Sequence, residues 1–170
     1  NKEYHFLAMK SLKKNKLKSE INFLNKNFKD LHNMKFHIIV SNPPWFPRNT
    51  TFQSKNLLIN DSKIESLNLD FWINKVFSNL TSLGEYYTIF PYNRIKVLIK
   101  VLKKYFNIIK VYPLASFKGL SANKAIVYAK KSNNKYKYCE FDNIIIHKSD
   151  KTFKSNINAI LRKGNPLSLS

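Results

Sequence analysis

The amino-acid sequence predicts an α/β fold, part of a doubly wound sheet that ends in an antiparallel hairpin. Three observations support this. Runs of β-branched and aromatic residues alternate with longer stretches in which apolar residues recur at helical spacing. The strand-like runs 108–114 and 125–129 follow each other with no helix between them, which indicates an antiparallel pair. The 170 residues, 44% of them hydrophobic, suffice for one domain with a core.

The chain before residue 42 predicts a helix followed by two strands. From 4 to about 17, apolar residues recur at near-helical spacing among lysines, a pattern typical of an amphipathic helix with a solvated basic face. Residues 21–24 alternate as a short strand, and a polar connector over 25–35 leads to the β-branched run at 38–40. This order of elements is that of half a doubly wound fold.

The chain after residue 46 predicts a long loop, two helices and a series of strands. The loop, at 47–66, is long enough that we expect it to be functional or disordered. The elements are expected as helices at 67–83, capped by Gly84, and 94–105, and as strands at 85–90, 108–114, 125–129, 138–141 and 144–147. We therefore expect a domain over 1–147 and a polar C-terminal tail over 148–170 that frays.

The most informative stretch is Asn42-Pro43-Pro44-Trp45, directly after the β-branched run. Two prolines continue neither a sheet ladder nor a helix, so the chain leaves the sheet there and Asn42 stands at the carboxyl end of a strand. In open α/β sheets, ligands bind at that edge. The alternative is a plain turn after a buried strand, with Trp45 as a core anchor.

This tetrapeptide resembles the Asn/Asp-Pro-Pro-aromatic motif of S-adenosylmethionine-dependent amino-methyltransferases, which act on adenine N6, cytosine N4 or a glutamine amide nitrogen. The resemblance implies that the catalytic residues are Asn42, Pro43, Pro44 and Trp45. The Asn42 side-chain oxygen and the Pro43 carbonyl would accept the hydrogens of the target amine, and Trp45 would stack on the base. It also implies that Asn42 and Asn27 contact the cofactor S-adenosyl-L-methionine, with Asn27 where the family usually has Asp.

The order of segments over 1 to about 147 is most similar to that of tRNA adenine-N6 methyltransferases, within the small-methyltransferase group. These have a Rossmann-like class I methyltransferase sheet with strand order 3-2-1-4-5-7-6. The segments that match the family's first strand, its glycine-rich cofactor loop and nearly all of its second strand are missing, and the chain has only three glycines. We therefore expect the C-terminal part of a methyltransferase, or one part of a split enzyme, that binds the cofactor poorly by itself.

A nucleic-acid partner, tRNA by the same resemblance, agrees with the charge. Thirty basic and ten acidic residues give a net charge of +20, which favours a polyanionic partner. Lysine-rich composition is also typical of AT-rich genomes. Arg48 and Lys55, with Lys63, are candidate phosphate contacts in the long loop, and the resemblance adds Lys118 and Lys124. Each could equally be an ordinary solvated side chain.

Other features narrow the class of protein. The single cysteine, Cys139, excludes an internal disulfide and fits a reducing, cytoplasmic compartment. No apolar run approaches the length of a membrane span, and no residue spacing indicates a metal site. We expect no metal, no membrane, and a monomer when the protein is full length.

Three alternative functions stay open: a release-factor glutamine methyltransferase, a DNA adenine methyltransferase, and a non-catalytic basic RNA-binding remnant.

Overall fold

The computed structural model of the chain describes residues 2–15, 21–31, 34–43 and 68–167. The chain forms two compact units, residues 1–34 and 35–170. In the first unit, α1 (Lys2–Asn15) confirms the predicted amphipathic helix, and the 3-10 turn η1 (Phe28–Asp30) follows it. The strand predicted at 21–24 is wrong, because these residues have no regular structure. Alternation alone does not make a strand where no neighbouring strand supplies its backbone hydrogen bonds.

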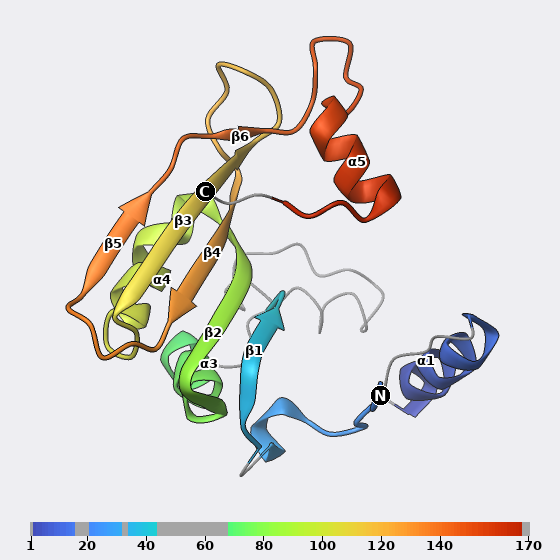
Figure 1. The fold of residues 1–170 in the computed structure, drawn as a ribbon, viewed down its shortest axis with the longest axis vertical. Coiled ribbons are helices and arrows are strands. Elements are labelled where there is room, and N and C mark those ends of the chain that lie inside the picture. Colours follow the sequence, from blue (N-terminus) through green and yellow to red (C-terminus); the bar gives the residue numbers. More distant parts are fainter. Residues whose placement is uncertain (1, 16–20, 32–33, 44–67, 168–170) are drawn as a thin grey trace. The chain divides into compact units, whose positions relative to one another are not determined.

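The second unit is built on a mixed sheet (Figure 1). Its strands are β1 (Phe36–Ser41), β2 (Leu80–Pro91), β3 (Ile108–Ala115), β4 (Lys124–Lys130), β5 (Lys137–Glu140) and β6 (Ile144–Ile145). Their order is β1-β2-β4-β3-β5, with β6 also on β3. β1 and β2 are parallel, and β4 is antiparallel to both of its neighbours. The order β1-β2-β4-β3 therefore reproduces the 4-5-7-6 half of the expected sheet.

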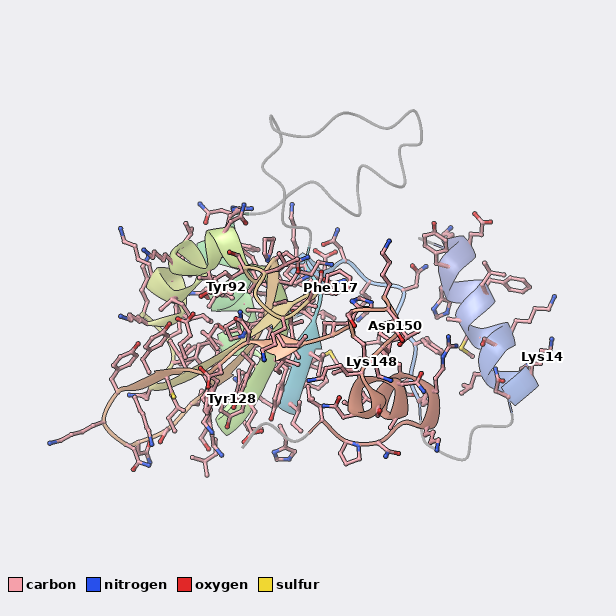
Figure 2. All side chains as sticks on the ribbon, turned by 90° about the horizontal axis from the view of Figure 1, so that it is seen from above. Lys14, Tyr92, Phe117, Tyr128, Lys148 and Asp150 are labelled. Atoms are coloured by element: carbon pink, nitrogen blue, oxygen red, sulfur yellow. The ribbon has the colours of Figure 1, made fainter. Side chains whose placement is uncertain are left out.

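The predicted antiparallel hairpin is confirmed as β3 and β4, but it does not form the edge of the sheet. β5 and β6 both pair in parallel with β3 and extend the sheet beyond it. On one face of the sheet, the Glu85 carboxylate accepts hydrogen bonds from Lys130 Nζ at 2.9 Å and from the hydroxyls of Tyr87 and Tyr128 at 3.1 Å. Tyr128 is labelled in Figure 2. These contacts link β2 to β4 across the sheet.

The core lies on the other face, against the helices α3 (Leu69–Ser78) and α4 (Ile95–Leu102). The ring of Phe106, which is 2% exposed, stacks on Tyr86 of β2 with centroids 6.3 Å apart and meets Phe77 of α3 edge-on at 5.6 Å. The 3-10 turn η2 (Tyr92–Arg94) joins β2 to α4. Both helices are thus held on the sheet by aromatic and aliphatic burial.

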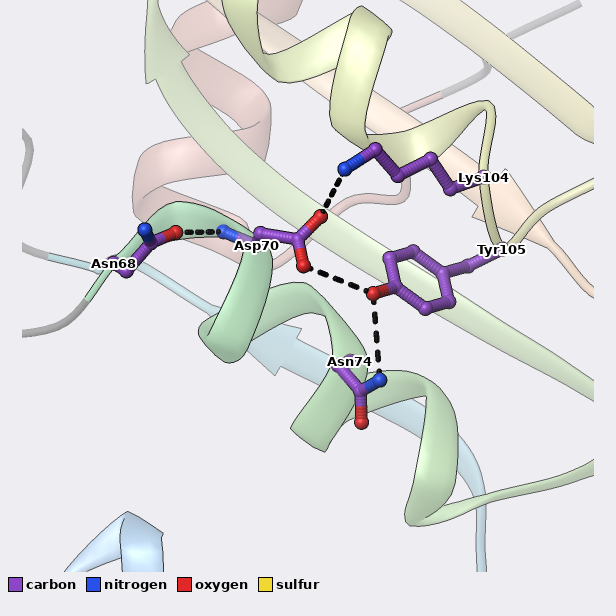
Figure 3. Close-up of polar contacts among 5 residues, drawn as sticks. All are labelled: Asn68, Asp70, Asn74, Lys104 and Tyr105. Carbon is purple, nitrogen blue, oxygen red and sulfur yellow. Dashed lines mark hydrogen bonds and ion pairs between the residues drawn. The ribbon is translucent and has the colours of Figure 1, made fainter.

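Polar contacts fix α3 against the end of α4 (Figure 3). The Asn68 side chain caps α3 by accepting from the Asp70 backbone N–H at 2.8 Å. The Asp70 carboxylate then accepts from Lys104 Nζ at 2.7 Å and from the Tyr105 hydroxyl at 3.1 Å. Asn74, one turn further along α3, donates to the same Tyr105 hydroxyl at 3.3 Å.

The predicted end of the first helix after the long loop is wrong. We expected a helix over 67–83 capped by Gly84, but α3 ends at Ser78 and β2 already begins at Leu80. Asn79 ends the helix, since its side chain donates back to the Lys75 carbonyl at 2.8 Å. Gly84 lies within β2, in the stretch where the register with β1 shifts, and a Cβ there would lie 2.8 Å from Leu80 Cβ.

The C-terminal segment does not fray as predicted over 155–163, because it forms the helix α5 (Ser155–Lys163). Ile157 anchors α5 with 6% exposure, and Gly164 ends it in the left-handed conformation with φ 68°. Before the helix, the ring of His147 lies between Phe117 and Phe153, with centroids 5.4 and 5.0 Å away. One buried isoleucine and this aromatic stack order a segment whose composition is mostly polar.

Candidate functional site

The candidate site begins at the carboxyl end of β1. Asn42 directly follows Ser41, the last residue of β1, and so stands at the carboxyl end of a strand as predicted. The Asn42 side chain is exposed, whereas Pro43 is buried. Pro44 and Trp45 lie outside the described residues, as do Arg48, Lys55 and the rest of the predicted long loop.

A buried tyrosine holds the last residue of β1 in place. The Tyr86 hydroxyl lies 2.7 Å from Ser41 Oγ and accepts from Trp72 Nε1 at 3.3 Å. Burial raises the pKa of Tyr86, and hydrogen bonds with Ser41, Thr88 and Trp72 only partly offset this effect. The phenol is therefore neutral at physiological pH. Its contact with Ser41 ties the end of β1 to β2 directly before Asn42.

Several of the predicted site residues meet at one edge of the sheet. β1, β2 and β3 run in the same direction, because β4 is antiparallel to both β2 and β3. Asn42 after β1 and the exposed Lys118 after β3 therefore lie at the same edge. Lys124 lies there too, since it begins β4 opposite Pro91 at the end of β2. The edge also carries Tyr92, whose backbone N–H donates to the Asn123 carbonyl at 3.0 Å.

Asn27 belongs to the other unit, and its predicted contact with the cofactor stays a prediction. Its side-chain oxygen accepts from the Lys29 backbone N–H at 3.0 Å and caps η1. That oxygen therefore already has a structural role as the cap of η1.

The described residues do not form a complete site for S-adenosylmethionine. Such sites in doubly wound folds use a glycine-rich turn after a strand, where the backbone approaches the ligand closely. The three glycines of this chain are used elsewhere. Gly84 lies inside β2, Gly119 lies in the turn between β3 and β4 with φ 84°, and Gly164 ends α5. Among the described residues, no turn with several glycines therefore follows a strand.

Sequence reasoning missed a groove of about 690 Å³ between α4 and β5. Lys96, Lys100 and Lys103 line it, together with Tyr92, Tyr138 and Glu140. The Glu140 carboxylate accepts from the Tyr92 hydroxyl at 2.5 Å and from the Tyr138 hydroxyl at 2.6 Å. The hydrogen bond to Glu140 raises the pKa of Tyr92, while burial and then Glu140 raise that of Tyr138. The only feature of the sequence that could have indicated this groove is the spacing of the three lysines, which places them on one face of a helix.

A second basic hollow, of about 700 Å³, lies beside α5. Lys148, Lys151 and Lys163 contribute to its lining, and so does His147, which contacts Phe117 of the turn that carries Lys118. Among the described residues, no helix has the length and apolarity needed to cross a membrane. Within the same part of the chain, no three His, Cys, Asp or Glu side chains gather as a metal site.

Comparisons with known proteins bear on the fold. No protein-family model and no curated protein matches the chain. The chain is similar to the crystal structure of a predicted O-methyltransferase from Agrobacterium tumefaciens, with a TM-score of 0.53 and 17% identity over 74% of this chain and 50% of that one. The M protein of the type I restriction enzyme EcoKI matches with a TM-score of 0.40 and 14% identity, over 76% of this chain and 30% of that protein.

The first of these similarities confirms the predicted fold class. The chain spans about half the length of the O-methyltransferase structure that it matches. Together with the strand order, the similarity shows that the chain shares the α/β fold of that methyltransferase structure over about three quarters of its length.

Proposed function

We propose that this chain forms the acceptor-binding part of an S-adenosylmethionine-dependent methyltransferase that methylates an exocyclic amine, namely adenine N6 in tRNA. One observation carries the proposal. Asn42-Pro43 stands at the carboxyl end of a parallel strand in a methyltransferase-like sheet, and the Ser41–Tyr86 contact ties the end of that strand to β2. This is the edge at which open α/β sheets bind their ligands.

The chemistry of an amine acceptor explains the residue types. The amino group of adenine is a poor nucleophile because its lone pair is conjugated with the ring. Two acceptors that hold its hydrogens, the Asn42 side-chain oxygen and the Pro43 carbonyl, would draw the lone pair out of conjugation. Pro43 has a fixed φ and no N–H, so its carbonyl is held in one direction without a competing donor. Trp45 would stack on the base.

The rate gain would come from positioning, with no covalent intermediate. S-adenosylmethionine would supply the methyl group when it is bound. The amine can lose its proton to solvent after transfer, so no side chain of this chain is required as a base. The catalytic work of these residues is therefore to orient the amine and to hold it in a polar, prearranged environment.

The exposure of β1 supports the proposal that a further segment packs against this strand and binds the methyl donor. Among the described residues, β1 pairs with β2 alone. Two of its β-branched residues are strongly exposed, Ile38 at 56% and Val40 at 75%. Strands of parallel sheets are normally covered on both faces and flanked on both sides. A neighbouring α/β segment packed against β1 would cover these side chains and supply the missing cofactor site.

The charge of the chain supports a nucleic-acid substrate. The net charge is +20, and Lys118 and Lys124 lie at the same sheet edge as Asn42. Such side chains bind phosphates with release of counterions. Arg48 and Lys55 are proposed to add contacts from the loop that follows the motif.

The test begins with calorimetric titration of S-adenosylmethionine into this chain and into a longer form that includes any upstream coding sequence. We expect clear binding by the longer form and little by the 170-residue chain. The form that binds is then assayed for methyl transfer from labelled cofactor to tRNA, duplex DNA and a release factor. Transfer to tRNA with methyl label on adenine N6 supports the proposal, and transfer only to the release factor contradicts the substrate assignment.

The Asn42→Ala variant of that form tests the site itself. Removing one preorganised acceptor should lower kcat by about 100- to 1,000-fold. The Kd for S-adenosylmethionine should change much less than kcat, because the proposed main role of the Asn42 amide is to hold the acceptor amine, and its contact with the cofactor is one of several. Asn134→Ala, in the exposed turn before β5, is the matched control and should keep full turnover. Wild-type turnover in Asn42→Ala would remove Asn42 from the site.

A further inference from the structure

We propose that the groove between α4 and β5 binds a single strand of RNA, with its phosphates on the lysines of α4 and its bases on the tyrosines. We call it the lysine–tyrosine groove, formed by Tyr92, Lys96, Lys100, Lys103, Tyr138 and Glu140. This inference rests on the proposed function, because it names a second contact surface for the same RNA substrate. It adds a site away from Asn42 that would hold the strand while the target base is methylated.

The lysines provide a continuous line of positive charge. Lys96, Lys100 and Lys103 are spaced four and three residues apart, so they share one face of the helical stretch, and all three are exposed. With a rise of about 1.5 Å per residue, the row spans about 10 Å. Stacked nucleotides advance about 3.4 Å each, so the row matches about three successive phosphates.

The tyrosines provide surfaces on which bases can stack. Tyr138 is 40% exposed, and Tyr136 beside it is 45% exposed. The Glu140 carboxylate holds the hydroxyls of Tyr92 and Tyr138, so those rings are fixed before any ligand arrives. Stacking on a fixed aromatic ring costs less conformational entropy than stacking on a free one, and every base has a π-face to offer.

The combination favours a nucleic-acid strand over an acidic polypeptide. Lys103 Nζ lies 5.8 Å from the ring centroid of Tyr138, so charge and aromatic surface lie side by side in the groove. The same Nζ lies 5.3 Å from the ring centroid of Tyr136, which lines a neighbouring pocket. Glu140 is the one carboxylate in the lining, and its two tyrosine contacts occupy both of its oxygens. Neighbouring cations and rings suit a ligand that carries both phosphates and bases.

The groove is continuous with the candidate catalytic edge through Tyr92. This residue lines the groove and also directly follows β2, at the edge of the sheet where Asn42 and Lys124 lie. Its backbone N–H bond to Asn123 ties the end of the groove to the residue before Lys124. A strand bound along α4 would therefore lead toward the site at which the amine is held.

Fluorescence anisotropy of the purified chain with a labelled 12-nucleotide single-stranded RNA tests the charge contribution over a range of salt concentrations. For the double variant Lys96→Gln/Lys100→Gln we expect a Kd about 10- to 25-fold higher near 0.1 M salt. We also expect the slope of log K against log salt concentration to be smaller by about 1.4, because each lost phosphate contact lowers it by about 0.7. The matched control, Lys10→Gln/Lys13→Gln, removes the same charge from α1 and should change the slope by less than half as much.

Two variants of Tyr138 separate the contribution of base stacking to RNA binding from that of the hydroxyl hydrogen bond. Tyr138→Phe keeps the ring and should raise the Kd less than about 3-fold, whereas Tyr138→Leu should raise it about 5- to 100-fold through the loss of one stacking contact. Circular dichroism checks that each variant keeps the fold. If the wild-type chain binds RNA and neither Lys96→Gln/Lys100→Gln nor Tyr138→Leu changes the Kd, the groove is not the RNA-binding site. The proposed function is then unaffected. Equal competition by polyglutamate also overturns it.

If the wild-type chain binds no RNA even at low salt, the proposal that the lysine–tyrosine groove binds RNA is also wrong. In that case, the fate of the proposed function is decided separately by the cofactor titration and by methyl transfer to tRNA, neither of which uses this binding assay.

Discussion

The buried hydroxyl of Tyr86 gives the sharpest test of how the site is held. Tyr86→Phe removes only the oxygen that contacts Ser41 Oγ at 2.7 Å and Trp72 Nε1 at 3.3 Å. The ring stays, and so does its stacking on Phe106. The change therefore leaves no large cavity, and its cost comes from polar partners that lose their hydrogen bonds.

The expected loss of stability follows from those partners. Tyr86 is 0% exposed, so water cannot readily replace the hydroxyl. Leaving a buried donor or acceptor unpaired costs about 1–3 kcal/mol in free energy of unfolding. A loss of about 2 kcal/mol corresponds to a fall in Tm of about 4–8 °C for a chain of this length. Ser41→Ala removes the same contact from the other side and should cost less, because the hydroxyl keeps its bond with Trp72.

The pH dependence adds a second, independent signature. Burial raises the pKa of Tyr86 in the folded chain, so above about pH 10 the unfolded chain loses this proton while the folded chain keeps it. The wild type therefore loses stability from this group as the pH rises above 10. Tyr86→Phe has no such proton, so the stability gap between the two chains should narrow as the pH rises from 10 to 11.

The assay is urea unfolding followed by far-ultraviolet circular dichroism at pH 7, 10 and 11. Tryptophan fluorescence is less suitable, because Trp72 contacts the altered hydroxyl. Other tyrosines titrate equally in both chains and cancel in the difference. A gap that stays constant with pH would show that Tyr86 ionises as freely in the folded chain as in the unfolded one. An absent gap at pH 7 would refute the stabilising role of its contacts.

Three further changes test the surrounding structure by urea unfolding. Gly84→Ala should cost about 1–3 kcal/mol, because the added Cβ would lie 2.8 Å from Leu80 Cβ in the well-packed start of β2. Burial raises the pKa of Glu85, but hydrogen bonds from Lys130 and two tyrosine hydroxyls outweigh it and hold that pKa below its ordinary value. Glu85→Gln should thus be less stable at pH 7, with a difference that disappears as the pH falls below about 4 through the folded pKa. Asn68→Ala should cost about 1 kcal/mol by removing the cap of α3, and Asn68→Ser should cost only a few tenths.

Much of the fold was predictable because the strands carry their own signal. Residues 125–129 of β4 alternate between buried and half-buried positions, as the period of two requires. The failures have local causes. Gly84 looked like a helix cap because glycine commonly ends helices, yet here it provides space for Leu80. The 21–24 run has the alternation of a strand without a partner, and α5 depends on Ile157, a single burial that composition cannot reveal.

The candidate site was predictable only where it follows from chain order. A β-branched run followed by prolines placed Asn42 at a strand end, and the structure agrees. The Ser41–Tyr86 contact spans 45 residues and depends on the register that sets Ser41 beside Thr88, which no local pattern encodes. The lysine–tyrosine groove depends on Glu140 reaching Tyr92, 48 residues earlier in the chain.

The antiparallel direction of β4 brings the start of this strand to the sheet edge at which β1, β2 and β3 end. In an all-parallel arrangement, the residue that begins a strand lies at the opposite edge from the residue that ends its neighbour. Because β4 runs antiparallel between β2 and β3, its first residue, Lys124, lies opposite Pro91 at the carboxyl end of β2. The turn with Lys118, the start of β4 and the groove that begins at Tyr92 thus share the edge of Asn42. The hairpin of β3 and β4 therefore brings cationic and aromatic side chains to the edge at which the proposed polyanionic acceptor would approach.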